Sequence, residues 1–250
     1  MPDRNERADV FLVSHGFASS RAEAQAAIQA GRVEADGQKI TKSAQKLREG
    51  MTVQYEPAHP YVSRGGVKLA AALDHFSLSP EGRVCLDIGA STGGFTQVLL
   101  ERGATRVYAI DVGHAQLHAK LRADPRVTAL DGLNARDLTA AKVPQAPQAI
   151  TADVSFISLK LALPPALHLA TKDAWVVLLV KPQFELGPRG VSKSGIVRDA
   201  SLREAAVAEI TGWMKAQAWQ VVGTIDSPIT GGEGNREYLL AAKRAEPQRR

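Results

Sequence analysis

The stretch Val84-Cys-Leu-Asp-Ile-Gly-Ala-Ser-Thr-Gly-Gly-Phe95 decides the fold. Its apolar first part, residues 84–88, is typical of a strand that is buried on both faces, and residues 94–102 continue as a helix. A glycine-rich turn between a buried strand and a helix is typical of an open α/β sheet. Ligands in such folds bind outside the carboxyl ends of the strands, so we expect this turn to border a ligand site.

Strands and helices alternate along the rest of the main domain. This alternation predicts an α/β fold with a doubly wound, Rossmann-like sheet of seven strands. The last two strands have no helix between them, so the final strand is expected to be antiparallel. The expected strands are 84–88, 107–110, 127–130, 149–153, 175–180, 220–225 and 237–241. The expected helices are 66–75, 94–102, 114–122, 158–171 and 199–217, the last with Ser201 and Glu204 as a capping box.

The first 57 residues predict a separate, small α+β domain. Two short helices are expected at 7–17 and 20–30, the second opened by a Ser20-x-x-Glu23 capping box. The pair Asp36-Gly37 predicts a tight hairpin turn after them. The expected organisation is this domain at 1–57, a proline-containing linker at 58–63, the main domain at 64–244 and a basic tail at 245–250.

Composition restricts the class of protein. Hydrophobic residues make up 44% of the chain, enough for a globular core, and no run reaches the length of a membrane span. Residues 1–10 are charged and do not look like a secretory signal. The single cysteine, Cys85, excludes an internal disulfide, so a cytoplasmic enzyme is expected. The net charge of +5 is consistent with an anionic partner, although residues 1–59 are formally neutral.

The glycine-rich turn is compatible with some cofactors and not with others. The dinucleotide pattern G-x-G-x-x-G is absent because Ser91 stands where the second glycine is needed, and no phosphate-binding G-x-x-x-x-G-K-[ST] loop is present. The pattern Asp87-x-Gly89-x-x-x-Gly93 resembles the first motif of S-adenosylmethionine-dependent methyltransferases. That cofactor carries no pyrophosphate. Asp111, at the end of the next strand, could bind its ribose hydroxyls.

A serine hydrolase is an alternative, because Gly89-Ala-Ser91-Thr-Gly93 also matches the G-x-S-x-G nucleophile elbow. Such an enzyme needs an acid and then a histidine later in the chain. The last histidine, His168, comes before the final strands and lies within an expected helix. A simple tight strand–helix connection is a further alternative, but it explains one glycine and not three flanked by polar residues.

Four charged residues lie at the ends of expected elements. Asp153 and Lys181 follow two apolar strands, Lys68 begins a helix, and Glu237 begins the last strand. Each alone would be read as a surface charge, but opposite charges delivered to one sheet edge are typical of a reaction centre.

Several motifs together resemble the TlyA family of FtsJ-like RNA ribose methyltransferases, which includes proteins named haemolysins. They are Val-Ser-Arg-Gly-Gly-Val-Lys68-Leu, the glycine-rich turn, Asp153-Val-Ser-Phe-Ile-Ser, Val-Lys181-Pro-Gln-Phe-Glu and Gly-Asn-Arg-Glu237-Tyr. The match covers nearly the whole chain. Residues 8–56 resemble the family's S4-type RNA-binding domain, through Ser20-Arg21 and the pattern from Ile28 to Val33.

The resemblance implies a cofactor, a substrate and a set of site residues. The cofactor is S-adenosylmethionine, the substrate is the ribose 2′-hydroxyl of cytidine in 16S or 23S ribosomal RNA, free or in ribosomal subunits, and no metal is needed. The implied catalytic residues are Lys68, Asp153, Lys181 and Glu237. The implied cofactor-binding residues are Asp87, Gly89, Ser91, Gly93, Phe95, Asp111 and Asn134. Candidate RNA contacts are Arg21, Arg32, Lys39, Lys42, Arg64 and Arg189, with Lys46 beside them.

Among the four catalytic candidates, Lys181 is expected to orient the hydroxyl or to remove its proton. Removing the proton requires a neutral amine, which burial and the charge of Lys68 would favour. Two other functions are compatible with the sequence: a non-catalytic RNA-binding factor of ribosome assembly, and a haemolysin. The complete set of four charged residues argues against the first, and the missing membrane segment argues against the second.

Overall fold

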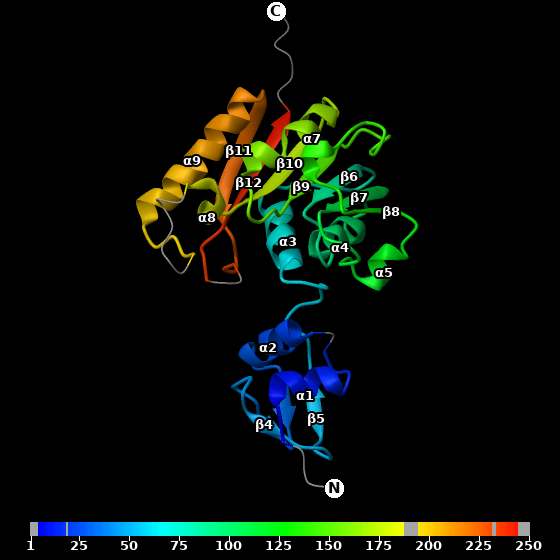
Figure 1. Cartoon of the computed structure of the whole chain (residues 1–250), viewed down its shortest axis with the longest axis vertical. Coiled ribbons are helices and arrows are strands. Elements are labelled where there is room, and N and C mark those ends of the chain that lie inside the picture. The colour runs from blue at the N-terminus through cyan, green and yellow to red at the C-terminus, as the bar shows by residue number, and fades with distance from the viewer. Residues whose placement is uncertain (1–4, 19, 188–194, 232–233, 245–250) are drawn as a thin grey trace, which may run out of the picture. The chain divides into compact units, whose positions relative to one another are not determined.

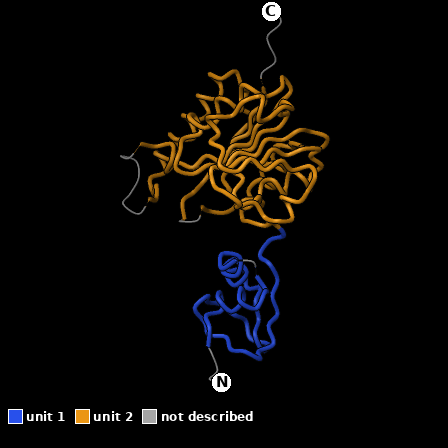
Figure 2. Tube along the Cα trace, turned by 45° about the vertical axis from the view of Figure 1, so that its right-hand side comes forward, with its two compact units in different colours: residues 1–60 blue, residues 61–250 orange. Residues whose placement is uncertain are grey.

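The computed structural model describes residues 5–18, 20–187, 195–231 and 234–244. Two compact units make up the chain, Met1–Pro60 and Tyr61–Arg250, and Figure 2 colours them separately. Each unit has a hydrophobic core of its own.

The first unit packs two helices against short antiparallel strands. Its helices are α1 (Ala8–Ser14) and α2 (Arg21–Gln29), and its strands are β1 (Glu6–Arg7), β2 (Val33–Ala35), β3 (Gln38–Lys39), β4 (Lys46–Leu47) and β5 (Val53–Tyr55). Strand β2 pairs with β3 and β5, while β1 pairs with β4. The Ser20 side chain accepts a hydrogen bond from the Glu23 backbone N–H at 3.2 Å, as the capping box predicts. Positive φ angles at Asp36 (49°) and Gly37 (76°) fit the predicted tight turn.

The second unit contains a seven-stranded sheet in the order β11-β12-β10-β9-β6-β7-β8 (Figure 1). Its strands are β6 (Val84–Ile88), β7 (Arg106–Asp111), β8 (Val127–Asp131), β9 (Ala149–Ala152), β10 (Trp175–Val180), β11 (Trp219–Asp226) and β12 (Tyr238–Arg244). Strands β6 to β10 are parallel, and β12 runs antiparallel to both of its neighbours. The predicted α/β class, the seven strands and the antiparallel final strand are confirmed.

Helices cover both faces of this sheet, which makes the fold doubly wound. One face packs against α3 (Gly65–His75), α4 (Gly94–Glu101) and α5 (Ala119–Arg122). The other packs against α6 (Leu159–Ala162), α7 (Pro164–Leu169), α9 (Ala200–Ala216) and the 3-10 turn η1 (Ala135–Asp137). A short helix α8 (Pro182–Glu185) follows β10. Because both faces are buried, every residue of β9 and β10 is buried.

Three expectations for the helices were wrong. The helix expected at 158–171 is two helices, because the ring of Pro164 removes a backbone donor and starts α7 anew. The helix expected at 114–122 begins only at Ala119, because the preceding residues form a turn in which Ala115 has a φ of 52°. Helix α9 is capped by Asp199, whose carboxylate accepts the Ser201 N–H at 2.8 Å, so the predicted Ser201–Glu204 capping box does not form.

None of the described helices is long and apolar enough to span a membrane.

Candidate active site

The carboxyl ends of the parallel strands bring the predicted residues to one edge of the sheet. Gly89 follows β6, Asp111 ends β7, Asp153 follows β9 and Lys181 follows β10. Strand β12 runs the other way, so its first residues reach the same edge. Val180 pairs with Tyr238, which sets Lys181 opposite Glu237 one step further along.

Gly89 sits where the sheet leaves no room for a side chain. Its backbone N–H and that of Ala90 both donate to the Ile110 carbonyl, at 2.9 and 3.0 Å. A Cβ at Gly89 would lie 2.2 Å from the carbonyl oxygen of Asp153, and the residue has a φ of 80°. This turn therefore requires glycine, and its backbone comes close to the end of β9.

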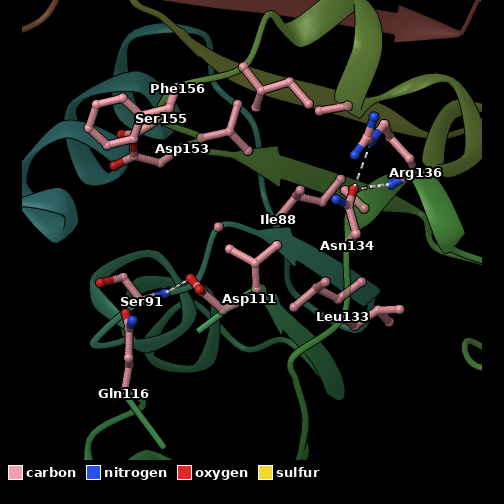
Figure 3. A pocket seen from close by; sticks show the side chains of 17 residues that line it. Ile88, Ser91, Asp111, Gln116, Leu133, Asn134, Arg136, Asp153, Ser155 and Phe156 are labelled. Carbon is pink, nitrogen blue, oxygen red and sulfur yellow. Dashed lines mark hydrogen bonds between the residues drawn. The ribbon is translucent and has the colours of Figure 1, made fainter. Parts of the chain in front are cut away.

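A cavity of about 550 Å³ opens beside this turn. Among its lining residues are four of the predicted cofactor contacts, Gly89, Ser91, Asp111 and Asn134. In Figure 3, Ser91 and Asp111 lie on one side of the cavity, Asn134 lies on another, and Asp153 lies on a third. The cavity therefore has carboxylates at two places and a glycine turn between them, with no cluster of cations for a phosphate.

Asp111 is held firmly at the cavity wall. Its carboxylate accepts the backbone N–H groups of Ser91 and Gly113, each at 2.7 Å. A carboxylate offers about four acceptor positions, so acceptor capacity remains for a ligand diol. Asn134 uses its side-chain oxygen to accept the N–H and the Nε of Arg136, at 3.0 and 3.2 Å.

Three predicted cofactor residues do not line the cavity. Asp87 is fully buried, and its carboxylate accepts the hydroxyls of Thr96 and Thr151 at 2.7 and 3.0 Å. Burial raises the pKa of Asp87 to about 7, and the nearby Asp153 carboxylate adds to this rise. Phe95 packs into the core beside the sheet, and a Cβ at Gly93 would collide with Leu121 at 2.3 Å. These three residues belong to the packing around the turn and not to the wall of the cavity.

Two of the four predicted catalytic residues form a buried ion pair. Lys68 on α3 and Glu237 before β12 are 6% and 4% exposed, and Lys68 Nζ lies 2.5 Å from Glu237 Oε2. The two residues are 169 positions apart in the chain. Glu237 therefore offsets the charge of Lys68 inside the protein.

The other two form a second pair at the wall of the cavity. Lys181 Nζ lies 2.6 Å from Asp153 Oδ1, in a charge contact whose angle is not that of a hydrogen bond. The same amine contacts Ser155 Oγ at 2.9 Å. Asp153 and Ser155 both line the cavity, so the amine of Lys181 contacts two residues of the cavity wall.

Sequence reasoning missed Phe156 and Ser155. Phe156 lines the cavity, yet its side chain is 91% exposed and its backbone has a φ of 64°. Figure 3 shows Phe156, Ser155 and Asp153 together on one side of the cavity. Both residues stand in the motif that begins at Asp153, but neither carries a charge, and the site prediction rested on charged residues at strand ends. A signal was available, because an aromatic residue in a strand-end loop three positions after a candidate catalytic aspartate has no core to fill.

The candidate RNA contacts are mostly exposed side chains. Lys39, Lys42 and Lys46 are exposed in the first unit, and Arg64 is exposed just before α3. Arg21 donates two hydrogen bonds to the fully buried Asp9 carboxylate, and Arg32 donates to the Pro57 carbonyl at 2.9 Å. Arg189 lies outside the described residues.

Within the described residues, no group of three histidine, cysteine or acidic side chains is arranged to hold a metal ion.

Comparisons with known proteins identify two domains. Residues 61–244 match the FtsJ-like methyltransferase family, and residues 6–53 match the S4 domain. A protein of Mycobacterium tuberculosis named 16S/23S rRNA (cytidine-2′-O)-methyltransferase TlyA is 44% identical, over 95% of this chain and 89% of its own length. A protein of Brachyspira hyodysenteriae named Hemolysin A is 43% identical, over 93% of this chain and 98% of its own.

Solved structures agree with these matches. A protein from Streptococcus thermophilus described as a hemolysin is 39% identical, with a TM-score of 0.77, over 97% of this chain and 89% of its own. A methyltransferase from Listeria monocytogenes, 15% identical with a TM-score of 0.53, shares the fold of the second unit. The family match spans the sheet, the glycine-rich turn and both ion pairs, and the identity extends through the first unit. The chain therefore belongs to the FtsJ-like methyltransferase family, as a TlyA-type member that carries an S4 domain.

Proposed function

We propose that this enzyme transfers a methyl group from S-adenosylmethionine to the ribose 2′-hydroxyl of a cytidine in 16S or 23S ribosomal RNA. The observation that carries the proposal is the two ion pairs: Lys68–Glu237, which is buried, and Lys181–Asp153, whose carboxylate lines a cavity suited to an adenosyl group. The activity named for the Mycobacterium tuberculosis relative supports the same reaction. Ribosomal RNA as target implies a cytoplasmic enzyme.

The cavity fits this cofactor on chemical grounds. Asp111 would bind the ribose hydroxyls through the acceptor capacity that its two backbone hydrogen bonds leave open. Gly89 lets the backbone approach the ligand, and Ser91 and Asn134 offer polar groups from either side. When bound, the cofactor would supply an electrophilic methyl group on a positively charged sulfur.

The protein must align a hydroxyl and find a place for its proton. Methyl transfer to a hydroxyl forms one carbon–oxygen bond, breaks one carbon–sulfur bond and releases one proton. Lys181 would hold the hydroxyl and accept its proton when its amine is neutral, because this amine contacts two residues that line the cavity. Asp153 and Ser155 fix the amine from two sides, which supplies the alignment on which such transfers depend.

Phe156 would receive the base of the target nucleotide. An exposed aromatic ring beside a reaction centre offers a stacking surface, and single-stranded or extruded bases commonly stack on such rings. Base–aromatic stacking contributes roughly 1–3 kcal/mol for each base. Exposed cations of the S4 domain, among them Lys39 and Lys42, would contact RNA phosphates, which adds affinity without reading sequence.

The test is methyl transfer from radiolabelled cofactor to RNA of cells that lack the gene. Ribosomal subunits and free ribosomal RNA should be offered separately, and 2′-O-methyl sites mapped in cells with and without the gene. We expect Lys181→Ala and Lys181→Arg both to lose about 10²- to 10⁴-fold in rate, because arginine keeps the charge but cannot become neutral. Cofactor affinity should change little.

A matched control is Lys172→Ala. Lys172 is exposed and precedes β10, so it lies at the opposite edge of the sheet from Lys181. A Lys181→Ala enzyme that binds cofactor and methylates at the Lys172→Ala rate would refute the assignment of Lys181. RNA binding by the wild type without any methyl transfer would instead support a non-catalytic assembly factor.

A further inference from the structure

Glu185 joins two loops that carry different parts of the site. It ends α8, four residues after Lys181. Its Oε2 accepts the hydroxyl of Ser158 at 2.5 Å, and its Oε1 accepts the backbone N–H of Leu159 at 2.9 Å. These two donors lie at the start of α6, in the loop that follows Asp153. Both carboxylate oxygens are therefore used to hold one loop against the other.

The same two loops meet again at their other end. Lys181 contacts Asp153 and Ser155 at 2.6 and 2.9 Å, before the loop reaches Phe156. The ring of Phe156 lies 5.1 Å from the ring of Phe184, which is on α8 beside Glu185. The loop 153–159 is thus fixed to the segment 181–185 on both sides of Phe156.

Phe156 occupies the position that needs such support. Its φ of 64° is in the left-handed region, which is energetically costly for a residue with a Cβ. Its side chain is 91% exposed, so packing of the ring contributes little to offset this cost. Strained backbone persists where the surrounding contacts impose it. The hydrogen bonds from Ser158 and Leu159 to Glu185 come two and three residues after the strained residue.

We propose that Glu185 is a positioning residue, whose two hydrogen bonds keep Phe156 in its left-handed conformation and so set where the target base stacks relative to Lys181. This inference rests on the proposed methylation of RNA. Glu185 itself is partly buried, does not line the cavity and contacts no reacting group. Its effect should therefore appear in the chemical step and in RNA binding, and not in cofactor binding.

The decisive comparison is between Glu185→Ala and Glu185→Gln in the full chain. Alanine removes both acceptors. Glutamine keeps an acceptor for the Leu159 N–H, and its amide donates to Ser158 Oγ. We expect Glu185→Ala to lose about 10- to 100-fold in kcat on ribosomal RNA, the scale of a small misplacement near the chemistry. Glu185→Gln should recover most of this rate. The Kd for the cofactor should stay within about threefold of the wild-type value in both variants, because Glu185 does not line the cavity.

Glu209→Ala is the matched control. Glu209 pairs with Lys160 one position beyond Leu159, so its removal also deletes a carboxylate beside α6 but leaves the Glu185 bonds intact. It should keep the wild-type rate. If Glu185→Ala does not fold, Ser158→Ala removes one of the two bonds and should show a smaller loss. A Glu185→Ala rate equal to that of Glu209→Ala, or a Glu185→Gln rate as low as that of alanine, overturns the proposal.

Two further measurements separate this inference from the proposed function. Amide exchange of residues 153–159, followed by mass spectrometry, should rise in Glu185→Ala and not in Glu209→Ala, and this readout needs no activity. A wild type that transfers no methyl group would sink the proposed function while leaving that result standing. In a Phe156→Ala background the Glu185→Ala loss should shrink to about threefold or less, because contacting residues that act together are not additive. If the rate losses of Glu185→Ala and Phe156→Ala combine in full in the double variant, Glu185 does not act through Phe156.

Discussion

Asp87 lies at the end of the strand that leads into the cavity's glycine-rich turn, but its side chain does not line the cavity. The Asp-x-Gly motif pointed to it as a cofactor contact, yet its carboxylate is fully buried between two threonine hydroxyls. Sequence spacing located the strand end correctly. It could not predict whether the Asp87 side chain points into the cavity or into the core. That orientation depends on partners distant in the sequence, such as the hydroxyl of Thr151, which is 64 positions away.

Asp87 should make stability depend on pH in a defined window. Burial raises its pKa from 3.8 to about 7, so between these values the folded state binds a proton that the unfolded state has released. Stability from this group is complete below about pH 4 and falls as pH rises toward 7, by about 1.4 kcal/mol per pH unit at most. Asp87→Asn should remove this fall. Urea unfolding of both proteins from pH 4.5 to 8 should show the variant gaining stability relative to wild type up to pH 7.

Asp173→Asn is the control for this effect. Asp173 is exposed, and its hydrogen bond from Thr171 and its pairing with Arg83 lower its pKa, so it titrates below this window. The difference between Asp173→Asn and wild type should therefore stay constant from pH 4.5 to 8. A constant difference for Asp87→Asn as well would mean that Asp87 is ionised throughout.

At the scale of elements, strands were predictable and helix ends were not. Strands β6 and β10 have the predicted bounds, because a parallel strand buried on both faces is a continuous apolar run. Helix ends depend on local competition for backbone groups. Asp199 accepts the Ser201 N–H and caps α9, which places Ser201 inside the helix rather than at its cap, and Pro164 divided one apolar helix into two. The contacts around Phe156 come from another element, α8, and no local pattern contains them.

The turn after β6 and helix α9 each contain a glycine whose replacement by alanine should have opposite effects. At Gly89, a Cβ would lie 2.2 Å from the Asp153 carbonyl in a left-handed backbone, so Gly89→Ala should destabilise the protein and abolish cofactor binding. At Gly212, inside α9, nothing lies within 4 Å of the added Cβ, so Gly212→Ala should stabilise by up to about 1 kcal/mol. Thermal unfolding and calorimetric titration with S-adenosylmethionine would measure both. Normal affinity in Gly89→Ala would remove the turn from the cofactor site.

At the scale of the whole molecule, composition gives the net charge but does not predict where that charge lies or how much of it is paired within the protein. The net charge of +5 belongs to the second unit, since residues 1–59 are formally neutral. In the first unit, the buried Asp9 carboxylate binds both Arg7 and Arg21. These arginines lower the pKa of Asp9. The carboxylate in turn offsets positive charge that a simple count of arginines would treat as available to bind RNA. RNA affinity should therefore depend strongly on cations of the methyltransferase unit.

Salt dependence can locate those cations. Arg64 is exposed immediately before α3, the helix that carries Lys68, whereas Lys172 is exposed at the opposite edge of the sheet. If Arg64 contacts a phosphate, Arg64→Ala should weaken binding of ribosomal RNA and reduce the slope of log K against log salt by about 0.7 to 1, because one fewer counterion is released. Lys172→Ala removes the same charge and should leave both slope and affinity near wild type. Binding titrations from 50 to 300 mM salt would measure these slopes. Equal slopes for the two variants would show that RNA does not contact Arg64.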